Sequence, residues 1–218
     1  MRYQKISFKD NQEKANQILR YYGLDSPDHE LPIDPELILR KMRIQPIPRK
    51  NLQKEHGIKG FVCIKNHSFQ VFIDEFHYFE QEESSRFTLG EELGHIILHL
   101  EEVDEIKDLQ DWMRVIVETS KHHRYIESQA RTFASNIILP EGAFKPYVLA
   151  WVGRHLTSLK RMKNISHEDL AFNIASDITE DLPVSNYIVQ IALNRWPDRI
   201  ILSVIDHYPE LMRRRLGE

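Results

Sequence analysis

A long helical pattern between residues 80 and 100 constrains the fold of this chain more than any other segment. Apolar side chains recur there at helical spacing and lie mostly on one side, at Phe87, Leu89, Leu93, Ile96, Ile97 and Leu100. A helix with an apolar face of this length is expected to be largely buried. The same segment, RFTLGEELGHIILH over 86–99, carries closely spaced acids and histidines.

The five residues 91–95 differ at one position from a known metal-binding pattern. In an HExxH helix two histidines four residues apart bind zinc, and the glutamate after the first one takes a proton from the bound water. Here the pattern reads Glu91, Glu92, Leu93, Gly94 and His95. The general base and the second histidine are therefore present, while Glu91 stands in place of the first histidine.

The rest of the chain predicts an α+β fold that is mostly helical. The runs GFVCIK (60–65) and FQVFID (69–74) predict an antiparallel hairpin, and 125–140 predicts a second long helix ended by Pro140. Further helices are expected at 11–22, at 36–44 after Asp34-Pro35, at 144–153, after the capping box Ser166–Asp169, and at 183–195. Residues 199–218 predict either a strand plus a helix or a tail that docks elsewhere.

Composition excludes several classes of protein. With 218 residues, 41% hydrophobic and 28% charged, the chain is long and apolar enough for a folded, soluble domain. A net charge of −4 gives no general attraction for nucleic acid, and no apolar run spans a membrane or forms a signal peptide. The single Cys63 excludes an internal disulfide. We therefore expect a cytoplasmic protein without direct nucleic-acid or membrane contacts.

Four ordered segments resemble the ImmA/IrrE-type family of HExxH metallopeptidases. They are LPIDPELILRKMRIQPI, RFTLGEELGH, ESQARTFASNIILP and DLPVSNYIVQIALNR, which together run from residue 31 to residue 195. The resemblance implies a metallopeptidase-like domain over 31–195, an N-terminal helix extension over 1–30 and a C-terminal extension over 196–218. It also implies a zincin-like active-site helix packed on a small antiparallel sheet, followed by a helical C-terminal part.

The resemblance assigns roles to individual residues. Glu92 falls on the general base, His95 and Glu127 fall on metal ligands, and Glu91 falls on the missing first ligand. Gly90 replaces a usual alanine, and Arg131 replaces an asparagine or aspartate. Members of the family use zinc and typically cleave a helix-turn-helix repressor or an antitoxin, in phage, toxin–antitoxin or transcription-regulating systems. A separate regulator of this kind is the implied partner.

Two interpretations of the changed site remain open. Glu91 and His95 lie one turn apart and can address one ion, and the extra carboxylate shifts the preference from Zn²⁺ toward Mn²⁺ or Fe²⁺. In the other interpretation no metal binds, and Arg131 supplies the cation that the crowded acids Glu91 and Glu127 require. Arg131 paired with Glu127 on the helix surface is the plainest alternative.

Three further histidines are secondary candidates. His99 stands at ligand spacing from His95, although a histidine at a helix end is more often structural. His122 and His123 precede the second long helix and are candidates for substrate contacts. The sequence thus supports two functions: hydrolysis of a peptide bond through a metal-bound water, or a catalytically inactive protein-binding or peptide-binding module that retains the peptidase cleft.

Overall fold

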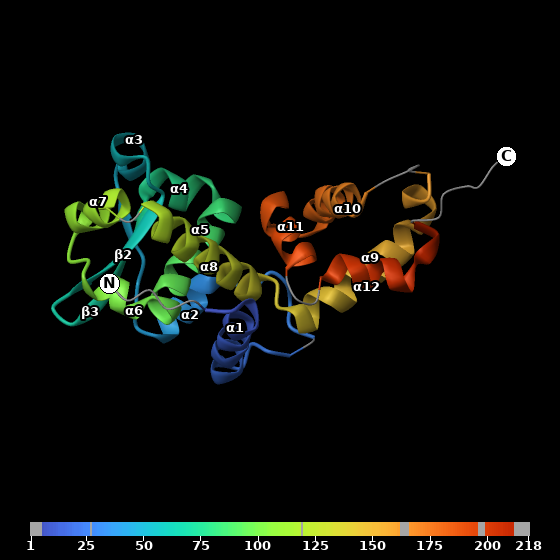
Figure 1. Cartoon of the computed structure of the whole chain (residues 1–218), viewed down its shortest axis with the longest axis horizontal. Helices are drawn as coiled ribbons and strands as arrows, with labels where there is room; N and C mark the ends of the chain where they lie inside the picture. The colour runs from blue at the N-terminus through green and yellow to red at the C-terminus, as the bar shows by residue number, and fades with distance from the viewer. Residues whose placement is uncertain (1–5, 27, 119, 162–165, 196–198, 212–218) are drawn as a thin grey trace.

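The computed structural model describes residues 6–26, 28–118, 120–161, 166–195 and 199–211. The chain forms an elongated molecule in which a small sheet and helices α1 to α8 make one half and helices α9 to α12 make the other (Figure 1). The fold is α+β and mostly helical, as the sequence predicts. No helix in the described ranges is both long enough and apolar enough to cross a membrane.

The first half begins with two capped helices. Helix α1 (Phe8–Tyr22) ends at Gly23, which adopts the left-handed conformation with φ 69° that glycine favours. Helix α2 (Pro35–Lys41) begins after Asp34, whose side chain accepts a hydrogen bond from Glu36 N–H, with Pro35 at the first helical position. Both helices lie where the turn and cap residues of the sequence predict them.

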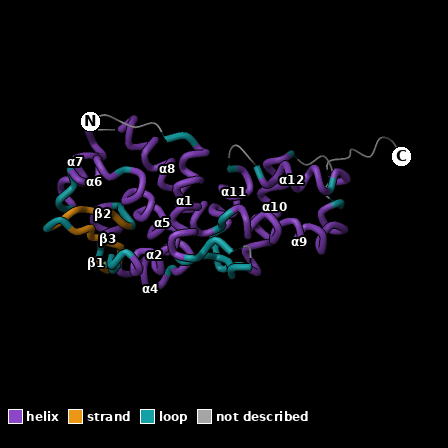
Figure 2. Tube along the Cα trace, turned by 90° about the horizontal axis from the view of Figure 1, so that it is seen from below, coloured by secondary structure: helices purple, strands orange, loops and turns teal. Residues whose placement is uncertain are grey.

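The sheet has three strands in the order β1-β3-β2 and lies at one end of the molecule (Figure 2). β2 (Gly60–Lys65) and β3 (Ser68–Asp74) form the predicted antiparallel hairpin, with Phe61 opposite Phe72. The short strand β1 (Ile47–Arg49) adds to β3 in the parallel direction, so the sheet is mixed rather than purely antiparallel. The sequence did not predict β1, because Pro46 and Pro48 argue against a strand. Proline is tolerated there because β1 is an edge strand.

Helices α5 (Glu82–Leu98) and α8 (Ser120–Ile138) form the centre of the first half and pack against each other. They approach closely at two glycines: a Cβ built on Gly90 would lie 2.9 Å from Ala134 Cβ, and one on Gly94 would lie 3.1 Å from Ala130 Cα. The sheet, α1 and α2 pack around this pair. The remaining helices of this half are α3 (Leu52–His56), α4 (Glu75–Glu80), α6 (Leu100–Asp104) and α7 (Leu109–Glu118).

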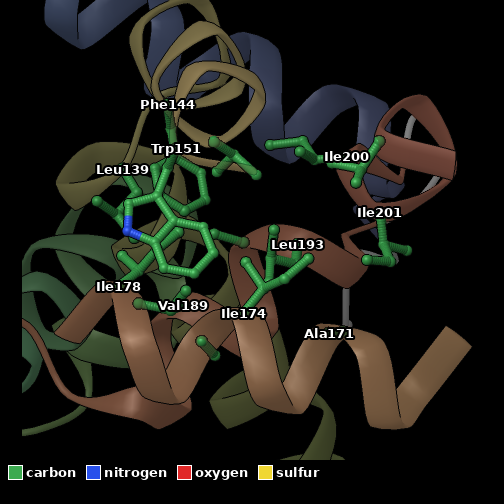
Figure 3. Close-up of a cluster of buried hydrophobic side chains, with 14 of the residues drawn as sticks. Leu139, Phe144, Trp151, Ala171, Ile174, Ile178, Val189, Leu193, Ile200 and Ile201 are labelled. Carbon is green, nitrogen blue, oxygen red and sulfur yellow. The ribbon is translucent and has the colours of Figure 1, made fainter. Parts of the chain in front are cut away.

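The second half is a helical cluster around Trp151 (Figure 3). It consists of α9 (Glu141–Leu159), α10 (His167–Asp181), α11 (Asn186–Asn194), α12 (Ile200–His207) and the short 3-10 turn η1 (Pro209–Leu211). The predicted capping box is present, since Ser166 accepts from Asp169 N–H while the Asp169 side chain accepts from Ser166 N–H.

The described part of residues 199–218 is a helix and not a strand. Ile200, Ile201 and Val204 of α12 are fully buried and belong to the same cluster as Leu193 and Trp151. The helix at 144–153 is also longer than predicted, because α9 continues through Pro146 from Glu141 to Leu159. The proposed domain limits at residues 30/31 and 195/196 stay predictions.

Candidate functional site

The site lies where α5 faces α8. Glu91, Glu92 and His95 lie within about one turn of α5, while Glu127 and Arg131 stand one turn apart on α8. The close approach at Gly90 and Gly94 brings the two helix backbones near enough for these side chains to meet. The arrangement thus joins Glu91 to Arg131, which are 40 positions apart in the sequence.

His95 and Glu127 are in direct contact. His95 Nε2 lies 3.3 Å from Glu127 Oε1, across the interface between the two helices. Burial alone would lower the pKa of His95, but the hydrogen bond and charge of Glu127, with the nearby Glu92 and Glu91, raise it to about 9. Burial works against the charge of Glu127 as well, yet the hydrogen bond and charge of His95 lower its pKa to about 2. The pair is therefore an imidazolium and a carboxylate at neutral pH.

Arg131 contacts the acid that replaces the first histidine. Arg131 Nε donates to Glu91 Oε1 over 3.0 Å, and only 18% of the Glu91 side chain is exposed. Burial and the charge of Glu127 raise the pKa of Glu91 to about 7, although Arg131 acts in the opposite direction. Arg131 thus stands where the sequence interpretation without metal requires a cation.

Glu92 is more deeply enclosed than Glu91. It is 6% exposed, and its carboxyl group lies near the backbone N–H of Val62 in β2, which lowers its pKa slightly. A Cβ on Gly60 would lie 3.2 Å from Glu92 Oε1, so the glycine leaves room for this carboxyl group beside the strand. Burial raises the pKa of Glu92 to about 8. It therefore holds a proton at neutral pH and is not a base there.

The secondary histidines have different surroundings. His99 is 2% exposed and contacts two polar groups: its Nδ1 lies 3.2 Å from His95 Nδ1, and its Nε2 lies 2.9 Å from Gln129 Oε1. Burial, and then the charge of His95, lower the pKa of His99 to about 4. His123 Nε2 lies 3.8 Å from Glu127 Oε1, and burial lowers its pKa. The side chain of His122 lies outside the described residues.

The donors fit a zinc ion only in part. Two ligands of one tetrahedral zinc ion lie about 3.3 Å apart when each bond is about 2 Å, which is the separation of His95 Nε2 and Glu127 Oε1. The third expected ligand, Glu91, does not fit, because it is hydrogen-bonded to the guanidinium group of Arg131. Among the described side chains no group of three His, Cys, Asp or Glu residues has the spacing to hold a metal ion. The described side chains therefore do not form a complete three-ligand metal centre.

Sequence reasoning missed two residues behind the site. Gln129 of α8 and Asn11 of α1 are buried, and Asn11 Nδ2 donates to the backbone carbonyl of Gln129 over 2.9 Å. Asn11 stands in register with the buried Ala15 and Leu19 on α1. A polar residue within the apolar stripe of an amphipathic helix was the available signal that Asn11 has a buried partner.

Comparison with known families agrees with the geometry. The model of the M78 peptidase family, described as the IrrE N-terminal-like domain, matches residues 71–166. No curated protein matches the chain in sequence. The matched segment contains all of α5 and α8, and the protein is accordingly metallopeptidase-like. Both helices of the site thus lie in the part of the chain that is similar to the ImmA/IrrE-type metallopeptidases.

Proposed function

We propose that this protein is a non-catalytic, regulatory member of its family that binds a protein partner through the peptidase fold. The observation that carries the proposal is the ion pair of Arg131 with Glu91 over 3.0 Å. The family pattern has a neutral metal ligand at position 91, whereas here a carboxyl group is hydrogen-bonded to Arg131, whose side chain is 46% exposed. The charge of this arginine thus takes the place of the charge that a metal would bring.

Electrostatics supports a cation supplied by the protein itself at this position. A guanidinium hydrogen-bonded to a carboxylate occupies one of its lone-pair directions and repels a second cation that approaches the same group. Glu91 and Glu127 would otherwise be two acids in a largely buried place, which is costly without a compensating charge. Arg131 meets this requirement without any ion from solution.

The protonation of the other groups points the same way. In the pair with Glu127 the pKa of His95 is raised to about 9, so a metal ion would have to displace a proton to bind this imidazole. Burial raises the pKa of Glu92 to about 8, so the protonated form of this carboxyl group is favoured as well. The centre is therefore a set of paired groups in which protons compete with a metal ion.

We propose a separate helix-turn-helix repressor or antitoxin as the partner, which is the class that the family resemblance implies. The competing function is peptide-bond hydrolysis in such a partner. The observation in its favour is the 3.3 Å separation of His95 Nε2 and Glu127 Oε1, which suits two ligands of one ion. Metal content separates the two functions.

The deciding measurement is elemental analysis of protein purified without chelator. We expect well under one equivalent of zinc, manganese and iron in the natural protein, since Glu91 is not free to bind. The double variant Glu91→His, Arg131→Asn should take up close to one equivalent of zinc, because it frees the position and supplies an imidazole. Near one equivalent in the natural protein, lost in His95→Ala, would overturn the proposal.

A matched control uses the same two helices. Glu83→His with Arg124→Asn makes the same change of residue types at exposed positions of α5 and α8. This pair should leave the metal content unchanged. Equal zinc uptake by the control and by the site variant would show that the added histidine binds zinc nonspecifically. It would contradict the proposal that Arg131 takes the place of a metal ion beside Glu91.

A further inference from the structure

Buried polar side chains form a connected path from the site to the second half of the molecule. His99 contacts both His95 and Gln129, and Asn11 Nδ2 donates to the backbone carbonyl of Gln129. Asn136 Nδ2 in turn donates to Asn11 Oδ1 over 3.3 Å. Arg195 completes the path with hydrogen bonds to Asn136 Oδ1 and to the carbonyl of Leu139.

The direction of each hydrogen bond along the first part of this path is fixed by Gln129. Gln129 Nε2 donates to the carbonyl of Ile6 over 3.1 Å, so its Oε1 faces His99. An amide oxygen only accepts, and His99 Nε2 must therefore carry the hydrogen. In a neutral ring the other nitrogen is then an acceptor, which allows His99 Nδ1 to accept from His95 Nδ1–H over 3.2 Å.

The outcome for His95 is a defined ring orientation. With Nδ1 bonded to His99, the opposite nitrogen Nε2 points to Glu127. A flip of the ring would break the bond to His99 and move Nε2 away from Glu127. Partners of this kind behind a functional histidine fix both its tautomer and its orientation.

We propose that Asn11 and Gln129 are positioning residues for His95. They hold the His99 ring in the tautomer protonated at Nε2, and through it they keep His95 Nε2 turned toward Glu127. Asn11 acts by anchoring the Gln129 backbone from α1, which lies outside the segment matched by the family model. Helix α1 is in this way a structural part of the site.

The inference goes beyond the proposed function and does not depend on it. The same orientation of His95 is needed for an ion pair with Glu127 and for a ligand role beside Glu127. The readout is therefore the state of the two rings and not cleavage or metal content. A failure of the proposed function in the metal measurement would leave this readout unaffected.

The test is NMR of imidazole nitrogens in ¹⁵N-histidine-labelled protein. In the natural protein His99 should show a protonated Nε2 and an unprotonated Nδ1. Gln129→Leu removes the acceptor at similar size, and the single-tautomer pattern of His99 should be lost together with a shift of both His95 nitrogens. Gln129→Glu keeps an oxygen acceptor for His99 Nε2–H, so it should preserve the pattern. Such a rescue would not arise from a general loss of packing.

Asn11→Ala provides an independent variant if Gln129→Leu does not fold. It should shift the same His99 and His95 signals, because the anchor of the Gln129 backbone is lost. Gln12→Ala is the matched control, since Gln12 is the next residue of α1 and its side chain bonds Glu141 instead. The proposal is overturned if folded Gln129→Leu keeps the natural signals, or if Asn11→Ala moves them no more than Gln12→Ala does.

Discussion

Glu92 shows at the scale of one residue how the surroundings decide the chemistry of a side chain. Its position in the family pattern is that of a base, which requires the ionised form. In this fold the residue is 6% exposed and its carboxyl group lies near the backbone N–H of Val62 in β2. Burial raises its pKa to about 8, so the protonated form of this carboxyl group is favoured at neutral pH.

The raised pKa of Glu92 predicts a loss of stability as pH rises. Between its ordinary value of 4.5 and about 8 the unfolded chain releases this proton while the folded chain keeps it. The stabilising contribution is therefore present below about pH 4.5 and is lost as pH rises through about 8. Glu92→Gln cannot ionise, and at pH 9 it should be more stable than the natural protein by more than about 1 kcal/mol.

Urea unfolding at pH 5 and pH 9 measures this effect. The two proteins should be close in stability at pH 5 and diverge at pH 9, with the variant higher. Glu83→Gln, at an exposed position of α5, is the control and should follow the natural protein at both values. A Glu92→Gln protein that is less stable than the natural one at pH 9 would contradict the burial of a protonated carboxyl group.

Sequence spacing predicts some contacts of the site and misses others for a physical reason. Arg131 lies one turn from Glu127 on one helix, so a cation near the acids follows from helix geometry. The bond from Asn11 to Gln129 joins residues 118 positions apart, and no local pattern sets the register of α1 on α8. The pKa values depend on how deeply each side chain is buried. Sequence periodicity shows only which face of a helix is buried and not how deep each residue on that face lies.

At the scale of elements the crossing of α5 and α8 controls the site. Gly90, which replaces the alanine expected from the family resemblance, is one of the two glycines at this crossing. A Cβ at Gly90 would meet Ala134 at 2.9 Å from Cβ and 3.2 Å from Cα, closer than side chains pack. The glycine therefore allows an approach of the helices that an alanine would prevent, at the level where Glu91 meets Arg131.

Gly90→Ala should consequently destabilise the protein. Alanine favours a helix by about 1 kcal/mol over glycine, but overpacking against the backbone of α8 costs about 1 to 3 kcal/mol. The expected result is a lower thermal midpoint despite the better helix former. Gly142→Ala in α9 is the control, because a Cβ there meets nothing within 4 Å, and it should keep or raise the midpoint. A stabilised Gly90→Ala protein would show that the interface between α5 and α8 accommodates a methyl group at this position.

At the scale of the whole molecule α8 connects the two hydrophobic clusters. Phe133 and Ile137 of this helix pack in the cluster around α5, while Ile138 and the following Leu139 pack in the cluster around Trp151. Helix α8 therefore carries site residues at one end and joins the second half at the other (Figure 1). The longer helices, such as α1, α5, α8 and α10, were predictable from caps and periodicity, whereas the short helices α3, α4 and α6 were not. The assignment of the helices to two clusters was not predictable either.

Packing of helix α12 against the second cluster is expected to stabilise the protein. Ile201 is fully buried against this cluster, whereas the adjacent Leu202 is 38% exposed. Ile201→Ala should cost about 2 to 5 kcal/mol through lost burial and the cavity left behind, and Leu202→Ala should cost much less. Thermal and urea unfolding of the two variants give the comparison. Helix α12 follows the segment with family resemblance. Equally small losses of unfolding free energy in both variants would mean that the second cluster is stable without this helix. The expected difference between the variants would make α12 part of the structural unit that α8 connects to the site.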